Sequence, residues 1–313
     1  MWCKRSLFRV LVIVLAIQAA GEACAADGVD LTREFLEAYG SNCAFGTAHA
    51  TEMRTYKVLF VPGYLNNLAP TYFADQLRWL GSIGVEREKV AVTSGRSVAI
   101  NAPIVATAIR NSVKPVILIT HSKGSVDALH ALVAEPSLRA KVKGWVSLQG
   151  AFFGTPVADM LLDRSPRDPI VANLILELFG GTKESVQGLT TRASLAYYRD
   201  HAAAIDTVLR NVPAIAFASM VDGTPDAHAK TVLKIPLELM WRERIRSDGL
   251  VPMDSAVLPG MDFVNVLGVD HIAPVMPAFQ PFDRVHMTKA LMIALRAPFR
   301  SLPRNADCED HRQ

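Results

Sequence analysis

Half of the 313 residues are apolar, and the formal net charge at pH 7 is only +3. A chain of this length and composition can bury a large core, which excludes a globally disordered protein and favours one large domain over two small ones. The sequence has no cluster of lysine and arginine with interleaved aromatic residues, so nucleic acid is not an expected partner.

The amino terminus has the composition of a secretory signal peptide. Basic residues precede the apolar run VLVIVLAI, and the small residues at 23–25 offer a cleavage site. The run is shorter than the roughly 20 residues that a membrane span requires. We therefore expect residues 1–25 to be removed, residues 26–313 to fold as a single domain, and the protein to be periplasmic or secreted. An uncleaved anchor helix and a lipid attached to Cys24 are the alternatives.

Two cysteines remain outside this segment, Cys43 near the start and Cys308 near the end of the expected domain. In an oxidising compartment they are candidates for a disulfide bond that joins the two ends. In the chain-entropy description a bond that closes so long a loop stabilises by up to about 5 kcal/mol. Two unpaired thiols are the alternative, because a pair of cysteines says nothing about geometry.

Short apolar runs rich in β-branched residues alternate along the chain with segments of helical periodicity. This alternation predicts an α/β fold with a mostly parallel central sheet flanked by helices. The runs are nearly continuous in apolar residues, as in strands buried on both faces. The predicted strands are 57–61, 89–92, 115–120, 144–148, 214–220 and 263–267. The predicted helices are 72–80, 99–109, 126–133 and 284–295.

One interval interrupts the alternation. Residues 154–211 contain no good strand pattern but include the helical stretches 170–179 and 189–209. An insertion of this kind after a sheet strand predicts a helical cap or lid at about 154–211. The apolar side chains of 170–179 would then form either an acyl-binding wall or a lid that opens at a lipid surface, although any cap helix that faces a core shows the same pattern.

The predicted strand 115–120 runs through His121 into Ser122 and then into a helix, with Gly124 two residues later. A serine between a buried strand and a helix is typical of a nucleophile elbow, which exposes the hydroxyl above the sheet. A glycine is needed there because a side chain would collide with neighbouring backbone. The pentapeptide is T-H-S-K-G, with Thr120 in place of the first glycine. Alternatively, Ser122 only caps the helix. We expect His121 to be a packed core histidine.

An acyl-transfer site also needs hydrogen-bond donors for the oxyanion of the tetrahedral intermediate. The backbone N–H of Lys123, directly after the serine, is one candidate. The second is the N–H of Tyr64, in the turn after the predicted strand 57–61, where Gly63 permits close approach of the backbone. Alternatively, Pro62 and Gly63 form only a turn.

The general base is sought among the late histidines, since the expected chain order is serine, acid, histidine. His271 directly follows the strand pattern at 263–267, whereas His286 lies in a predicted helix and His311 in a polar tail. His271 is therefore the candidate base.

The acid that orients the base is expected in a loop between the serine and the histidine. Asp248 is the first candidate because it lies in a glycine-containing loop upstream of His271. Asp222, just after the predicted strand 214–220, is the second. Asp270 is adjacent to His271 and would have difficulty pointing at its ring.

Several of these segments, in order between Lys57 and Ala290, resemble the bacterial triacylglycerol lipases and their esterase relatives. The G-T-P-V-A-D run at 154–159 resembles a segment that follows a strand in that family, and 187–198 resembles part of its cap. The D-G-L-V run at 248–251 matches the loop that holds the triad aspartate, and 270–272 matches the segment with the triad histidine.

The resemblance implies an α/β-hydrolase fold and hydrolysis of carboxylic esters, lipid-like acyl esters among them, by Ser122, His271 and Asp248 through an acyl-enzyme. A small ester or lipid is the implied partner, with transient contact to a lipid surface and no cofactor. The same triad would serve an acyltransferase or a polyester or thioester hydrolase, and a catalytically silent binding protein is a third class. The family's oxyanion loop begins H-G, where this chain has Pro62-Gly63. One calcium ligand of the family corresponds to Ala273, so no metal is expected.

Overall fold

The computed structural model describes residues 28–41, 45–64, 66, 69–162, 182–221, 231, 233–277 and 281–302. The expected signal peptide, the apolar stretch 170–179, Asp222, His311 and both cysteines of the expected disulfide lie outside the described residues, so the expectations that concern them stay predictions. None of the helices within the described ranges is long and apolar enough to cross a membrane.

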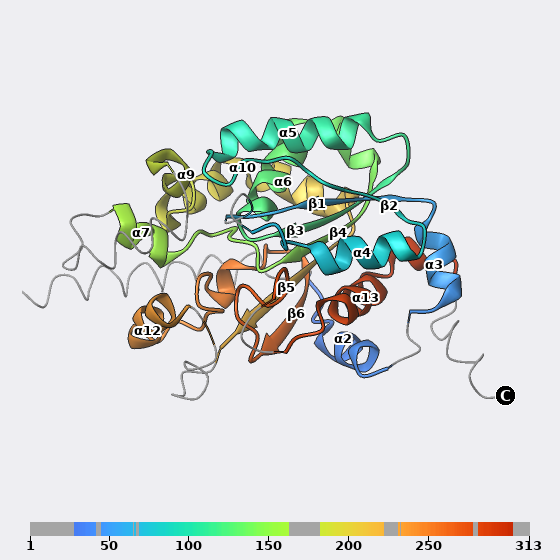
Figure 1. The fold of residues 1–313 in the computed structure, drawn as a ribbon. Coiled ribbons are helices and arrows are strands. Elements are labelled where there is room, and N and C mark those ends of the chain that lie inside the picture. Colours follow the sequence, from blue (N-terminus) through green and yellow to red (C-terminus); the bar gives the residue numbers. More distant parts are fainter. Residues whose placement is uncertain are drawn as a thin grey trace, which may run out of the picture.

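The centre of the molecule is a six-stranded parallel sheet (Figure 1). Its strand order is β2-β1-β3-β4-β5-β6, and every neighbouring pair is parallel. The strands are β1 Lys57–Val61, β2 Glu86–Lys89, β3 Val116–His121, β4 Val142–Leu148, β5 Ala214–Met220 and β6 Asp262–Leu267. The predicted parallel sheet is therefore confirmed, and five of its strands lie within a few residues of their expected positions.

Side chains that alternate along each strand enter two separate cores, one on each face of the sheet. In β1, Val58 and Phe60 belong to one core while Leu59 and Val61 belong to the other. Both sets of side chains are fully buried. Because each face of these strands is covered, their sequences are continuously apolar instead of alternating.

Helices cover both faces (Figure 1). On one face lie α5 Val98–Asn111, α6 Lys123–Ala134 and α10 Thr191–Asn211. On the other lie α2 Thr32–Tyr39, α3 Thr47–Met53, α4 Ala74–Ser82 and α13 Arg284–Leu295. The four helices predicted at 72–80, 99–109, 126–133 and 284–295 correspond to α4, α5, α6 and α13. Three short 3-10 helices lie in the connections, η1 Pro136–Ala140, η2 Met253–Ser255 and η3 Ala297–Phe299.

The second strand differs from its expected position. The sequence predicts a strand at 89–92, but β2 runs from Glu86 to Lys89 and pairs with β1 from Lys57 to Phe60. Because β2 is an edge strand, its charged side chains remain in solvent, and charges on an edge also discourage pairing with other chains. Val90 and Val92 are buried, but they follow the strand as it enters a loop. The apolar pattern therefore identified the buried residues that follow β2, and it missed most of the residues that pair with β1.

The interval 154–211 divides into two parts with different surroundings. The carboxyl-terminal part is α10, which packs against α6 and places Ile205 and Val208 in one of the sheet cores. The amino-terminal part contains α7 Pro156–Leu162 and α9 Lys183–Gln187. Its buried side chains join a third apolar group, whose members from elsewhere include Tyr64 and Leu250. The described residues 156–162 and 182–189 thus lie next to the site, and the role of this region as a lid stays a prediction.

The helices α2 and α3 were not predicted, and neither was α12 Lys234–Arg242, which lies between β5 and β6. It lies on the same side of the molecule as α7 and α9 (Figure 1). Leu237 and Met240 are buried side chains of this helix. The helix also contains Pro236 in its first turn, a position that tolerates proline because the N–H there has no partner within the helix.

Candidate active site

Ser122 lies in the sharp turn between β3 and α6. Its backbone angles are φ 54° and ψ −128°, a conformation that residues with a side chain seldom adopt. The Ser122 N–H donates to the carbonyl oxygen of Leu148 at the end of β4, at 3.0 Å. This strained turn at the carboxyl end of a central strand has the backbone geometry of a nucleophile elbow.

Two glycines allow the turn to pack against the end of β1. A Cβ atom on Gly124 would lie 2.3 Å from the carbonyl oxygen of Val61, and one on Gly63 would lie 2.8 Å from the Ser122 Cβ. Real Cβ atoms do not approach other atoms so closely. Both positions therefore require glycine for steric reasons, as the sequence predicted for Gly124.

Gly124→Ala is expected to destabilise the protein by about 1–3 kcal/mol or more, because the added methyl group meets rigid backbone. Gly188→Ala is the matched control. At Gly188 the nearest atom to an added Cβ is 3.7 Å away and φ is −66°, so that change should be nearly neutral or slightly stabilising. Urea unfolding of both variants measures the difference, and equal midpoints would contradict the steric argument.

Thr120 occupies the place of the first glycine of the elbow motif, and a small polar cluster accommodates it. Its hydroxyl is 2.8 Å from the Ser125 hydroxyl and accepts a hydrogen bond from the Trp145 indole N–H at 2.9 Å. Ser147 donates to Ser125 at 2.9 Å. All four side chains are buried. The departure from the usual motif is therefore compensated by hydrogen bonds.

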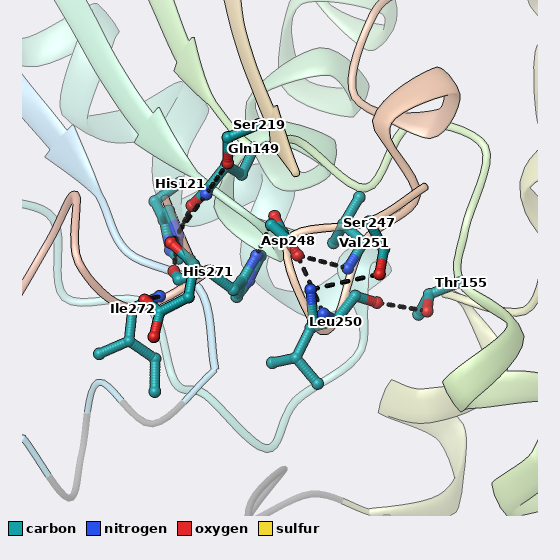
Figure 2. A network of polar contacts seen from close by, with 12 residues as sticks. His121, Gln149, Thr155, Ser219, Ser247, Asp248, Leu250, Val251, His271 and Ile272 are labelled. Atoms are coloured by element: carbon teal, nitrogen blue, oxygen red, sulfur yellow. Dashed lines mark hydrogen bonds and ion pairs between the residues drawn. The ribbon is translucent and has the colours of Figure 1, made fainter. Parts of the chain in front are cut away.

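Asp248 and His271 form a buried hydrogen-bonded pair (Figure 2). The His271 Nδ1 atom is 2.7 Å from the Asp248 Oδ2 atom, and the His271 N–H donates to the Asp248 carbonyl oxygen at 2.9 Å. His271 is 5% exposed and Asp248 is 1% exposed. A carboxylate in this position selects the tautomer in which Nδ1 carries the proton, and it leaves Nε2 able to accept one.

The other carboxylate oxygen of Asp248 is held by its own loop. Oδ1 accepts hydrogen bonds from the N–H groups of Leu250 and Val251, at 2.9 and 2.8 Å (Figure 2). The Thr155 hydroxyl donates to the Leu250 carbonyl oxygen, and this bond joins the Asp248 loop to the segment that follows β4. These bonds fix the direction of the carboxylate toward His271.

Ser122 and His271 line the same pocket, which has a volume of about 560 Å³ including its open mouth. Its other lining residues are mostly apolar, and they come from the loops at the carboxyl ends of the strands and from the 151–189 region. They are Tyr64, Tyr72, His121, Ala151, Thr155, Leu189, Leu233, Leu250, Val251, Ile272, Val275 and Met276.

The two candidate oxyanion donors lie on adjacent segments. A Cβ atom on Gly63 would be 3.3 Å from the Lys123 amide nitrogen, so the Gly63–Tyr64 turn touches the start of α6. The Gly63 N–H itself donates to the Tyr72 hydroxyl at 3.0 Å and is therefore already bonded. The N–H groups of Tyr64 and Lys123 stay the predicted donors for an oxyanion.

The side chain of Lys123 has a separate, structural environment. It is 1% exposed, and its Nζ atom lies 2.7 and 2.9 Å from the two carboxylate oxygens of Asp127. Asn101 donates to the same carboxylate at 3.1 Å. Burial lowers the pKa of Lys123 and raises the pKa of Asp127 to about 6 against the opposing effect of their attraction. No pattern in the sequence indicated that this pair is buried.

Asp127→Ala is expected to lower the free energy of unfolding by about 3–5 kcal/mol, because it leaves the Lys123 ammonium buried without a partner. The double variant Lys123→Met/Asp127→Leu should be closer to the wild type, since it removes both charges. The exposed pair Asp206 and Arg210 serves as control, and Asp206→Ala should cost less than about 1 kcal/mol. Chemical denaturation of the four proteins is the measurement. A double variant as unstable as Asp127→Ala would contradict this prediction.

The remaining candidates of the sequence analysis lie elsewhere. Asp270 does not face the His271 ring: its carboxylate accepts from the N–H groups of Ile272 and Ala273 and from the Thr231 hydroxyl. His286 lies on α13, packs edge-on against Tyr39 and is not among the residues that line the pocket. Among the described residues, no group of three or more His, Cys, Asp or Glu side chains is placed to hold a metal ion.

His121 is buried, as predicted, but it is not an isolated core residue. It contacts Tyr72, Gln149 and His271. Neither Tyr72 nor Gln149 was singled out from the sequence. Both lie far along the chain from their partners, so no local pattern could have identified them.

A six-stranded parallel sheet between two helical layers, with a serine elbow after its third strand, defines the α/β-hydrolase fold. The fold is shared with a metagenomic carboxyl esterase, MGS0156, at 20% identity and a TM-score of 0.66, over 89% of this chain and 94% of that one. It is also shared with the mature form of the Bacillus licheniformis lipase BlEst2, at 17% identity and a TM-score of 0.58, over 77% and 90% of the two chains. No protein-family model and no curated protein matches the sequence.

Proposed function

We propose that the protein is an exported serine hydrolase that cleaves carboxylic esters. The observation that carries the proposal is the convergence of a strained serine elbow and a buried Asp248–His271 pair on one pocket. This is the arrangement of a nucleophile, a base and an orienting acid. The esterase and lipase that share the fold add support, as does the signal-peptide composition of residues 1–25.

In the proposed mechanism His271 Nε2 takes the proton of the Ser122 hydroxyl while the serine oxygen bonds to the acyl carbon. The N–H groups of Tyr64 and Lys123 hold the resulting oxyanion. The intermediate collapses as the ester C–O bond breaks, and the imidazolium returns its proton to the leaving alcohol. A water molecule, deprotonated by His271, then attacks the acyl-enzyme, and Ser122 recovers its proton when the carboxylic acid leaves.

The lining of the pocket favours an apolar acyl group. Leu189, Leu233, Leu250, Ile272 and Met276 surround the space next to Ser122 and offer no charge to a polar substrate. Burial of an apolar chain against such side chains contributes about 0.8 kcal/mol for each methylene that it covers. An ester of a carboxylic acid with an aliphatic chain is therefore the proposed substrate class.

A fluorophosphonate probe tests the proposal, followed by a panel of p-nitrophenyl esters of increasing chain length. We expect one probe molecule per protein, attached to Ser122, and turnover that the probe abolishes. Ser137, which is exposed, is the control serine and should carry no label. Absence of labelling in folded protein would contradict the proposed nucleophile and favour a binding protein. Product analysis with a competing alcohol separates a hydrolase, which releases mainly acid, from an acyltransferase, which forms mainly the new ester.

A further inference from the structure

A buried polar network passes through His121, the residue before the serine. His121 is 2% exposed. Its Nδ1 atom is 2.5 Å from the Tyr72 hydroxyl. Its Nε2 atom is 2.9 Å from the carbonyl oxygen of His271 and 3.2 Å from the Gln149 Oε1 atom (Figure 2). Both ring nitrogens are therefore occupied.

The partners of His121 determine its tautomer. A carbonyl oxygen accepts and cannot donate, so the bond to His271 requires a proton on Nε2. The Gln149 amide group fits this assignment, because its nitrogen is used to donate to Ser219 and to the Asp270 carbonyl oxygen, which turns its oxygen toward His121. Nδ1 is then an acceptor, and the Tyr72 hydroxyl donates to it. Burial, and then the neighbouring His271, hold the pKa of His121 well below its usual range, so the ring stays neutral.

These bonds form a continuous, oriented chain between two loops. The Gly63 N–H donates to the Tyr72 oxygen, the Tyr72 O–H donates to His121 Nδ1, and the His121 Nε2–H donates to the His271 carbonyl. Gly63 precedes the candidate oxyanion donor Tyr64, and His271 is the candidate base. The chain thus joins the two parts of the site that must be held at a fixed distance on either side of Ser122.

We infer that His121 is a positioning residue that couples the oxyanion loop at Gly63 to the base at His271. The inference rests on the proposed function, in which both loops act on the same acyl carbon. A neutral imidazole suits this place because it offers one acceptor and one donor on a rigid ring, while its stiffness fixes their separation. Misplacement of catalytic groups by about 1 Å can lower the rate about 100-fold. Loss of the coupling should therefore be measurable as a loss of rate.

Two substitutions break the chain while they keep an aromatic ring in place. His121→Phe removes all three hydrogen-bond contacts of the imidazole, and Tyr72→Phe removes only the bridging hydroxyl. Each should lower kcat for p-nitrophenyl acetate by about tenfold or more with little change in KM, because alignment and not binding is lost. The double variant should be no slower than His121→Phe alone, since the two residues act in one chain. His121→Gln, which retains an acceptor and a donor, should recover part of kcat.

His49→Phe is the matched control. His49 is also buried, but it lies on α3 in an aromatic cluster with Phe45 and Phe299 and does not line the pocket. This variant should keep the wild-type kcat at temperatures where all variants remain folded. If His121→Phe also kept kcat within about twofold of an active wild type, a purely structural role would stand and the inference would be wrong.

Amide hydrogen exchange decides the inference even if the wild type hydrolyses no ester, which would be a failure of the proposed function alone. Both His121→Phe and Tyr72→Phe should speed exchange at two separate amides, those of Gly63 and His271. Faster exchange at only one of the two loops would overturn the coupling. Nitrogen NMR of the wild type supplies the last readout, and a proton found on Nδ1 of His121 instead of Nε2 would also overturn it.

Discussion

Ser122→Ala is expected to lower kcat/KM for p-nitrophenyl esters by at least about 10³-fold, and by as much as about 10⁶-fold if the background is low. The hydroxyl is the only group in the proposed mechanism that forms a covalent bond to the acyl carbon, so no neighbour can replace it. Residual activity would come from the oxyanion donors and from binding alone. Steady-state kinetics on purified protein measures the effect.

A stability measurement and a matched serine variant separate this loss of activity from misfolding. Alanine has the same difficulty as serine at φ 54°, so the midpoint of urea unfolding should change little. Ser137→Ala, on an exposed 3-10 helix, is the matched serine variant and should retain full activity. Wild-type turnover by Ser122→Ala would refute the assignment of the nucleophile.

Asp248→Asn is expected to lower kcat by about 10⁴-fold. The reason is specific to this loop. The N–H groups of Leu250 and Val251 point at the Oδ1 position, so the asparagine carbonyl oxygen must stay there and the NH₂ group must face His271. The imidazole then accepts at Nδ1 and carries its proton on Nε2, which cannot take the proton of Ser122. The base is present but in the wrong tautomer.

Asp254→Asn is the control for this second prediction. Asp254 lies in the same region, but its side chain is exposed and forms an ion pair with Arg246 at the surface. It should leave kcat unchanged. Asp222→Asn distinguishes the second candidate acid. If Asp222→Asn removed activity while Asp248→Asn kept it, the orienting acid would be Asp222 and the interpretation of the Asp248 loop would be wrong.

The fold was largely predictable because its signals are local. Strands covered on both faces are continuously apolar, and β1, β3, β4 and β5 lie close to the ranges expected from that pattern. The elbow was visible for the same reason, since strand, serine, glycine and helix follow one another in the chain. The edge strand β2 escaped this reasoning because an edge needs no apolar side chains.

The arrangement of the site depended on contacts between distant segments. The sequence proposed an acid and a base in the required order, but only the tertiary structure places Asp248 against His271 and leaves Asp270 bonded to its own turn. The bridging hydroxyl of Tyr72 and the amide of Gln149 had no local signal at all. The Lys123–Asp127 spacing of four residues was visible, whereas the burial of the pair was not.

The α/β architecture, the serine turn and the candidate order of the catalytic groups can thus be derived from the amino-acid sequence, because each follows from periodicity and from the steric demands of a single turn. Which polar side chains meet depends on how the folded chain brings distant segments together. Buried hydrogen-bonding groups need partners wherever the folded chain supplies them, and those partners come from loops more than a hundred residues apart, as His121 and His271 show.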